Sequence, residues 1–513
     1  MMNWIRLAFI TLAAMLGTFM EVLDTTITNV AIPHIAGNLS VSTDEATWVI
    51  TSYLVANAII LPITPWLAGI IGRKRLFMLC VLTFTGSSFL CGIAPNLTTL
   101  IIARILQGLG GGGLQPIEQA ILLEAYPPEK RGLAMAFYGL VVVIAPVLGP
   151  IVGGWITDNY SWRWSFFINL PIGTLSFILI YLFIEDPPYL KRIKTSFDFI
   201  GLFLLALFLG TLQFILDKGE REDWFNSDLI IYFSIICIIA GIFFFIWEKH
   251  EKEPVVDLSL LKNWNFAFSV IFITVLGIVL YGSITLVPIM LQNLAGYDAF
   301  KAGLVLGTGG VGGFISMFIT ARLITRIEGK YLILCGVFLH SLSMYLMSKL
   351  NLEASFLQYC IPRFIQGLSL GMLFIPISVA SVAYLPKEKI GNATGIYNLM
   401  RNIGGSIGIA MVMTLLNRRA QFHQTMLVDN LHQMNLRLFY SIESLNKMLN
   451  WNFTNLPGFE KLLSYKILEL EILRQAYLES FIENFHFLIY LSLIISFAFL
   501  LKKTPKGKDI SIH

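Results

Sequence analysis

Long apolar stretches follow one another along almost the whole chain, separated mostly by short polar connections. A helix needs about 20 apolar residues to cross a lipid bilayer, and fourteen stretches approach this length. Only 13% of the 513 residues are charged, against about 25% in soluble domains. The chain is therefore predicted to be an all-α membrane protein. Its predicted spans are residues 7–30, 46–71, 76–95, 98–123, 132–157, 163–184, 197–216, 228–247, 264–291, 300–325, 330–349, 355–384, 390–417 and 484–501.

Several other classes of protein are disfavoured by the sequence. It contains no basic run with interleaved aromatic residues, which would indicate nucleic-acid binding. No nucleotide-binding loop, hydrolase motif or metal motif stands out. The 5 cysteines lie singly inside apolar stretches, which favours buried hydrophobic side chains over disulfides or metal ligands. We expect neither an enzyme nor a resident cofactor, and no nucleic acid as a partner.

The basic residues of the short connections gather on one side of the predicted membrane. An even number of spans places both termini on the same side, which also holds the basic clusters at 73–75, 191–194 and 502–508. Positively charged loops remain in the cytoplasm, so both termini are predicted to be cytoplasmic. The first apolar stretch is too long for a signal peptide and is predicted to be retained as the first span.

The second half of the chain repeats residues of the first half at the same spacing. Segment 104–112 recurs as 363–371, with Arg, Gln and two Gly at matching positions, and segment 129–149 recurs as 388–408. Internal repeats of this kind are typical of membrane transporters. The predicted domains are an N-terminal six-helix bundle (1–190), an inserted helix pair (191–250) and a C-terminal six-helix bundle (251–513).

Two carboxylates lie in the first predicted helix, where a buried charge is costly and usually functional. Glu21 and Asp24 are three residues apart and Thr28 lies four beyond Asp24, so we place all three on one face. A carboxylate in a low-dielectric site can load and release protons near neutral pH, which makes Asp24 and Glu21 candidates for proton coupling. The alternative is a static ion pair with an arginine.

Arg104, in the fourth predicted helix, is the expected partner of Asp24. A guanidinium beside this carboxylate would oppose its protonation, so their separation would set when Asp24 takes up a proton. Arg104 would otherwise serve a structural purpose, by bonding backbone carbonyls of the first helix. The two roles are compatible.

Further polar residues inside the predicted spans are candidates for a substrate cavity. Glu118 lies close to four helical turns after Arg104, so both face the same way. It either attracts cationic drugs or is a solvated residue near the cytoplasmic mouth. Arg401 lines either a cavity or a packing surface, whereas Arg363, with no evident carboxylate in its half, is expected to be structural. The full set of cavity candidates is Asn29, Tyr53, Asn57, Gln115, Glu118, Asn398 and Arg401.

The fifth predicted helix carries small residues at four-residue spacing, at Ala145, Gly149 and Gly153. Such a stripe lets another helix approach closely, and two prolines bend the helix. The sequence therefore predicts a tight but mobile seam between the two halves. The motif comprises Ala145, Pro146, Gly149, Pro150, Gly153 and Gly154.

One connection, at residues 418–483, is far longer than the others and is predicted to lie outside the membrane, opposite the termini. Apolar residues recur in it at helical spacing from Leu431 to Leu449, which predicts an amphipathic helix. An exposed apolar stripe needs a partner. The helix packs on its own loop, on a second copy of the chain, on the membrane surface or on another protein. Either Leu438, Ile442 and Leu445 contact that protein, or the helix covers the outer face of the bundle.

Five segments together resemble the EmrB-type group of the fourteen-helix drug:proton antiporter family, in the major facilitator superfamily. They are the helix-1 motif Leu23–Pro33, the segment Thr47–Tyr53, the helix-4 motif Arg104–Gly108, the helix-5 motif Ala145–Gly154 that is associated with antiporters, and the segment Val256–Leu260. The resemblance covers nearly the whole chain. It implies the major facilitator fold, with two six-helix bundles and two inserted helices.

The resemblance also implies a function. Such proteins export amphipathic, hydrophobic compounds in exchange for protons, so the proton gradient takes the place of a cofactor. They reside in the inner membrane of bacteria with two membranes, joined to a periplasmic adaptor and an outer-membrane channel, and Leu438, Ile442 and Leu445 are then expected to contact the adaptor. The alternatives are a dedicated exporter of a single compound such as a siderophore, and more remotely a membrane enzyme or a sensor.

The loop between the second and third predicted helices departs from the superfamily pattern. Pro65 and Gly69 stand where Gly and Asp are usual, which weakens a gating role for Arg73. Such a role would need an acidic partner.

Overall fold

The computed structural model describes residues 4–186, 198–251, 254–429, 442–444 and 459–502. These residues form helices and connections. The first half contains α1 (Trp4–Leu39), α2 (Thr43–Ala46), α3 (Trp48–Ile71), α4 (Arg73–Ile93), α5 (Leu97–Gly111), α6 (Leu114–Ala125), α7 (Arg131–Asn159), α8 (Trp164–Phe167) and α9 (Asn169–Phe183). Two helices follow, α10 (Phe199–Lys218) and α11 (Asp228–His250), which the sequence analysis interprets as an inserted pair. The second half contains α12 (Trp264–Asn293), α13 (Ala299–Leu323), α14 (Gly329–Ser348), α15 (Phe356–Ser381), α16 (Ile390–Asp429) and α18 (Phe459–Ser492).

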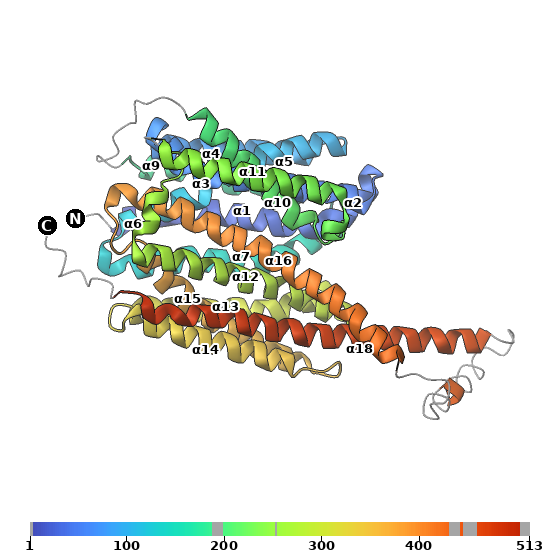
Figure 1. Cartoon of the computed structure of the whole chain (residues 1–513). Coiled ribbons are helices and arrows are strands. Elements are labelled where there is room, and N and C mark those ends of the chain that lie inside the picture. Colours follow the sequence, from blue (N-terminus) through green and yellow to red (C-terminus); the bar gives the residue numbers. More distant parts are fainter. Residues whose placement is uncertain (1–3, 187–197, 252–253, 430–441, 445–458, 503–513) are drawn as a thin grey trace.

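Short 3-10 turns complete the fold: η1 (Pro128–Lys130), η2 (Trp224–Asn226), η3 (Leu258–Lys262), η4 (Lys387–Lys389) and η5 (Leu493–Leu500). In the described part of the chain, 14 helical segments are long and apolar enough to cross a membrane. Each overlaps one predicted span, although several are longer than predicted, so the predicted fold class is confirmed. The chain enters α1 and leaves η5 at the same end of the bundle (Figure 1), which we call the termini side.

The two halves meet where α7 packs against α13 and α15, and where α3 and α6 pack against α16. On the termini side these contacts are close, because a Cβ at Gly132 of α7 would lie 2.7 Å from Ile324, and one at Gly395 of α16 would lie 2.8 Å from Pro65. The halves are therefore in contact on the termini side in this conformation.

Helix α10 bridges the halves on the opposite side. Its Lys218 donates to Thr47, just before α3, at 2.8 Å, while its Gln213 accepts from Ser406 of α16 at 3.0 Å. α11 packs on α10 and exposes apolar side chains such as Ile238 along its outer face. A helix that exposes so many apolar side chains is suited to contact lipid.

The predicted loop at 418–483 is wrong in its extent. Helix α16 continues to Asp429 and α18 already begins at Phe459, so both run well beyond the apolar core of their spans. They extend past the other helices on the side opposite the termini (Figure 1). Of the three residues predicted to contact an adaptor, Leu438 and Leu445 lie outside the described residues, and Ile442 is half-buried in a short helical piece.

The glycine stripe of α7 lies against α1, which corrects the predicted seam between the halves. A Cβ at Gly149 would overlap Thr26 Oγ1, and one at Gly153 would lie 3.2 Å from Ile27. Ala145 is buried in the same small apolar cluster as Ile27. The opposite face of α7 contacts α13, so the stripe instead joins α7 to α1 inside the first half.

Gly149→Ala is expected to destabilise the protein, because the added methyl group overlaps Thr26 and overpacking costs about 1–3 kcal/mol. Gly154→Ala is the matched control, since a Cβ there meets nothing within 4 Å and Ala favours helix over Gly by about 0.5–1 kcal/mol. Thermal unfolding of the purified variants in detergent measures both effects. Equal melting temperatures for the two variants would contradict the close packing of α7 on α1.

Candidate functional site

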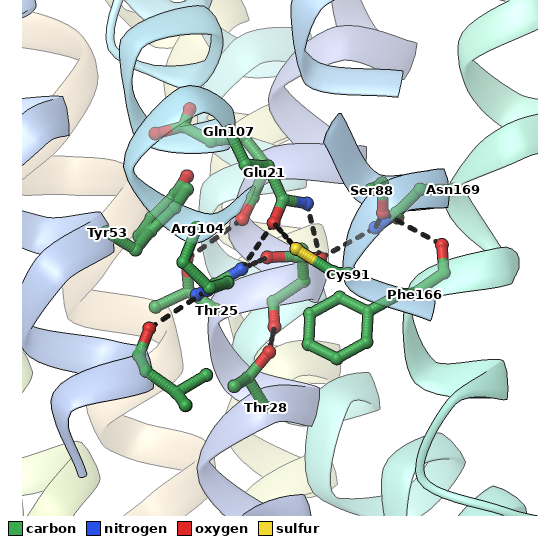
Figure 2. Close-up of polar contacts among 12 residues, drawn as sticks. Glu21, Thr25, Thr28, Tyr53, Ser88, Cys91, Arg104, Gln107, Phe166 and Asn169 are labelled. Carbon is green, nitrogen blue, oxygen red and sulfur yellow. Dashed lines mark hydrogen bonds and ion pairs between the residues drawn. The ribbon is translucent and has the colours of Figure 1, made fainter. Parts of the chain in front are cut away.

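Asp24 lies near the middle of α1 and is completely buried. Its Oδ2 accepts a hydrogen bond from Arg104 Nη1 at 2.5 Å, and its Oδ1 accepts from Gln107 Nε2 at 2.9 Å and from Asn169 Nδ2 at 2.7 Å. Figure 2 shows Arg104, Gln107 and Asn169 converging from α5 and α9. The predicted partnership of Asp24 with Arg104 is therefore present.

Arg104 is fixed by more than the carboxylate. Its Nε donates to the backbone carbonyl of Val49 at 3.0 Å, and its guanidinium lies 4.2 Å from the centre of the Tyr53 ring. Of the two roles predicted for Arg104, the structure shows the ion pair together with a backbone bond, although the carbonyl belongs to α3 and not to the first helix. Tyr53 is buried and packs on Arg104, so in this conformation it supports the ion pair.

Asn169 was not identified from the sequence. Its amide donates both to Asp24 and, at 3.0 Å, to Ser88 Oγ of α4, which in turn donates to the carbonyl of Phe166 at 2.9 Å. The only signal in the sequence is an amide inside an otherwise apolar span. An amide in such a span predicts a buried hydrogen bond, but it does not identify the residue that accepts it.

Glu21 points to a different part of the bundle from Asp24. It is nearly buried, at 4% exposure, and its Oε1 accepts from Asn57 Nδ2 of α3 at 2.9 Å. Gln115 of α6 and Arg401 of α16 interact electrostatically with it. Side chains three residues apart on a helix point in directions about 60° apart. Glu21 and Asp24, predicted to share one face, therefore lie in two different environments.

A chain of polar contacts crosses from the first half to the second beside Glu21. Arg401 of α16 donates to Gln115 Oε1 and, at 3.5 Å, to Tyr138 Oη of α7. Tyr138 donates to Asn398 Oδ1 at 3.2 Å, and Asn398 donates to Gln119 Oε1 of α6 at 2.5 Å. All five side chains are buried. The structure thus brings Gln115, Asn398 and Arg401 together, and adds Gln119 and Tyr138, which the sequence did not indicate.

The comparisons with known proteins fit this arrangement. The sequence pattern described as Major Facilitator Superfamily matches residues 14–409. This chain belongs to the Major Facilitator Superfamily. The solved structure of the human organic anion transporter MFSD10 (TETRAN) matches with a TM-score of 0.58 at 14% identity, covering 95% of this chain and 99% of that one. At that identity the match supports the fold alone.

Relatives within the superfamily are similar over most of their length. The "Multidrug export protein EmrB" of Haemophilus influenzae is 40% identical over 431 residues, which is 84% of each chain. The "Fatty acid resistance protein FarB" of Neisseria gonorrhoeae is 39% identical over 83% of this chain and 84% of its own. The predicted resemblance to EmrB-type proteins is confirmed by this similarity.

Glu118 of this superfamily member is completely buried, so the prediction of a solvated residue is wrong. Its Oε2 accepts from the backbone N–H of Thr18 at 3.0 Å and from the Thr18 hydroxyl. The absence of a side chain at Gly17 makes room, because a Cβ there would overlap Glu118 Oε1. Glu118 and Arg104 both contact α1, as their spacing predicts. An attraction for cationic drugs stays a prediction.

Asn29 and Arg73 complete the set of predicted residues. Asn29 is exposed on α1, apart from the buried contacts above. Arg73, at the start of α4, forms an ion pair at 2.5 Å with Glu124 of α6, and both side chains are almost fully buried. The acidic partner that a gating role requires is therefore present, on a helix that the loop motif itself does not reveal.

The ion pair of Asp24 with Arg104 is expected to dominate local stability. Removing one partner of a buried pair costs about 3–5 kcal/mol, because the other charge is left uncompensated. Arg104→Gln should therefore destabilise the protein strongly, and Asp24→Asn combined with Arg104→Gln should cost less than the sum of the two single changes.

Thermal unfolding of the three variants measures this coupling. Lys466→Gln is the control, since Lys466 pairs with Glu469 at the surface with both side chains more than half exposed. Surface pairs contribute little, so the control should melt with the wild type. Additive effects of the two changes at Asp24 and Arg104 would show that the pair is not a coupled unit.

Proposed function

We propose that the chain is a proton-driven antiporter that exports amphipathic, hydrophobic drugs. The observation that carries this proposal is the carboxylate of Asp24, which is completely buried and held by Arg104, Gln107 and Asn169. Charged groups inside a membrane helix mark ion and proton pathways. Relatives named multidrug export proteins, at 37–40% identity, support the class of substrate.

Protonation of Asp24 is the step that we assign to the proton gradient. A neutral carboxyl group attracts a guanidinium less than a carboxylate does, because the charge interaction is lost. The bonds around Asp24 join α1, α5 and α9, and Arg104 extends them to the backbone of α3. Loss of the charge therefore loosens four helices at once. The proton gradient, and no resident cofactor, supplies the energy.

Substrate recognition is assigned to the polar residues where the halves meet. Glu21, Asn57 and Gln115 offer hydrogen bonds and a negative charge beside Arg401. An amphipathic compound would place its polar group there and its apolar part on the surrounding side chains. The relative named a fatty acid resistance protein supports amphipathic substrates. A dedicated exporter of one compound is the alternative, and resistance to a panel of unrelated drugs separates the two.

Asp24→Asn is expected to abolish drug-driven proton movement in liposomes that hold the purified protein. Asparagine keeps the shape of the protonated acid but cannot release a proton, so the cycle stalls. The readout is the internal pH after a drug gradient is imposed, at equal amounts of folded protein. The matched control is Glu129→Gln, which neutralises an exposed carboxylate on the termini side. Wild-type proton movement by Asp24→Asn would refute the assignment.

We further propose that the protein resides in the bacterial inner membrane, with both termini cytoplasmic, as part of a tripartite pump. The basic connections on the termini side support this orientation. The projecting ends of α16 and α18 would then lie in the periplasm (Figure 1). Arg419 of α16 and Glu483 of α18 form a bidentate ion pair there, which holds the two helices together. We propose that these projecting ends of α16 and α18 contact a periplasmic adaptor, which in turn joins an outer-membrane channel.

Replacing Leu438, Ile442 and Leu445 by Ser is expected to reduce co-purification of an adaptor while drug-driven proton movement persists in adaptor-free liposomes. The reason is that an apolar contact with the adaptor is lost, whereas none of the residues assigned to proton coupling or substrate recognition is changed. A fall in both measurements would assign these residues to the transporter itself. No change in either would show that they contact nothing of consequence.

A further inference from the structure

The second half of the bundle reproduces the hydrogen bonds around Asp24, but with a serine in place of the acid. Gln107 donates to Asp24, 83 residues before it, and Gln366 donates to Ser283 Oγ at 2.6 Å, also 83 residues before it. Arg363 bonds Gln366 as Arg104 bonds Gln107. Ser283 therefore occupies the position that Asp24 holds in the first half.

Among the residues that the structure describes, this replacement leaves Arg363 without a neutralising charge. Its side chain is only 4% exposed, and none of the Asp or Glu residues that the structure describes forms an ion pair with it. Within the same residues its Nε has no hydrogen-bond partner. The other three buried arginines differ, because each has an acidic partner: Arg73 pairs with Glu124, Arg104 pairs with Asp24, and Arg401 interacts with Glu21. A buried, uncompensated charge is strongly unfavourable.

A second unsatisfied side chain lies near this arginine. His340 of α14 is completely buried, and both of its ring nitrogens lack a partner among the described residues. It lies one turn before Ser343, whose hydroxyl donates at 2.6 Å to the carbonyl of Pro362, the residue before Arg363. Gly309 of α13 borders the guanidinium, since a Cβ there would lie 3.2 Å from Arg363 Nε. Two buried donors without acceptors in one small region indicate a missing acceptor.

We propose that the second half binds a monovalent anion between Arg363 and His340, at the position where the first half carries the carboxylate of Asp24. Arg363 supplies charge and an N–H donor, and His340 supplies a ring N–H. Ser283 marks the place of the missing acid, while its own hydroxyl donates to the carbonyl of Leu280 at 2.9 Å. The anion is either the carboxylate of an amphipathic acid or a free halide. Both share the chemistry of a compact negative charge.

The test is the thermal unfolding of the full-length protein in neutral detergent, at constant ionic strength with the bulky sulfonate isethionate as the reference anion. Replacing isethionate by chloride or by hexanoate is expected to raise the melting temperature by about 3 °C at an anion concentration about tenfold above Kd, because a ligand of the folded state stabilises it. Arg363→Gln should remove this shift. Hexanol, which lacks the charge, is the control for the apolar tail.

A matched pair of variants tests the position of the anion. Ser283→Asp places a fixed carboxylate beside Arg363, so the melting temperature in isethionate should rise and the response to added anions should disappear. Ser283→Asn introduces a side chain of nearly the same size as Asp but without the charge, so this variant should keep the response of the melting temperature to added anions. This pair decides the question even if Arg363→Gln fails to fold.

The outcomes separate the sources of the anion. A shift with chloride as well as hexanoate assigns the site to free anions, whereas a shift with hexanoate alone assigns it to the head of an acidic amphiphile. The proposal is overturned if neither anion shifts the wild type more than Arg363→Gln, or if Ser283→Asp responds to anions as the wild type does. Because binding alone is measured, these results do not depend on proton-coupled transport.

Discussion

The cost of a charge inside the membrane is the constraint on which this structure depends. The carboxylate of Asp24 is surrounded by a guanidinium and two amides, and each of these donors belongs to a helix that must therefore stay in place. Arg104 in turn reaches the backbone of α3 through Val49. Apolar side chains pack about as favourably against lipid as against a neighbouring helix, so they do not by themselves select a partner helix. In the first half, the buried charge fixes which helices are neighbours.

The two halves solve the same packing problem with different electrostatics. The first half contains its counter-charge in Asp24, whereas the second half has Ser283 at the equivalent position and, within the described residues, no counter-charge for Arg363. Where the halves meet, Arg401 is bound by neutral groups, Gln115 and Tyr138, close to Glu21. Proton uptake in one half and anion binding in the other would then act on one common interface, which lies between them.

The sequence was sufficient for the spans, the internal repeat and the pairing of Asp24 with Arg104, because apolar length and charge in an apolar helix are strong local signals. It could not supply the partners of Asn169 or Tyr138, since a single polar residue in a span does not reveal which helix it faces. The continuation of α16 and α18 beyond their spans was not predicted, for another reason. α16 continues to Asp429 in polar sequence, and a search for apolar length ends a helix where the membrane ends, although backbone hydrogen bonds continue outside it.

Helix α1 links Asp24, Glu118 and the junction of the two halves, and the glycine motif of α7 packs on this same helix. Gly149 of α7 lies against Thr26, two residues after Asp24, while Thr18 of the same helix holds Glu118 and Glu21 faces the junction of the halves. A shift of α1 that follows a change at Asp24 is therefore felt at α7, and the opposite face of α7 contacts α13 of the second half. Because close packing resists continuous deformation, α1 and α7 move together or lose their contact. The small stripe thus joins the halves indirectly, because it packs α7 on the helix that carries Asp24 while α7 also contacts α13.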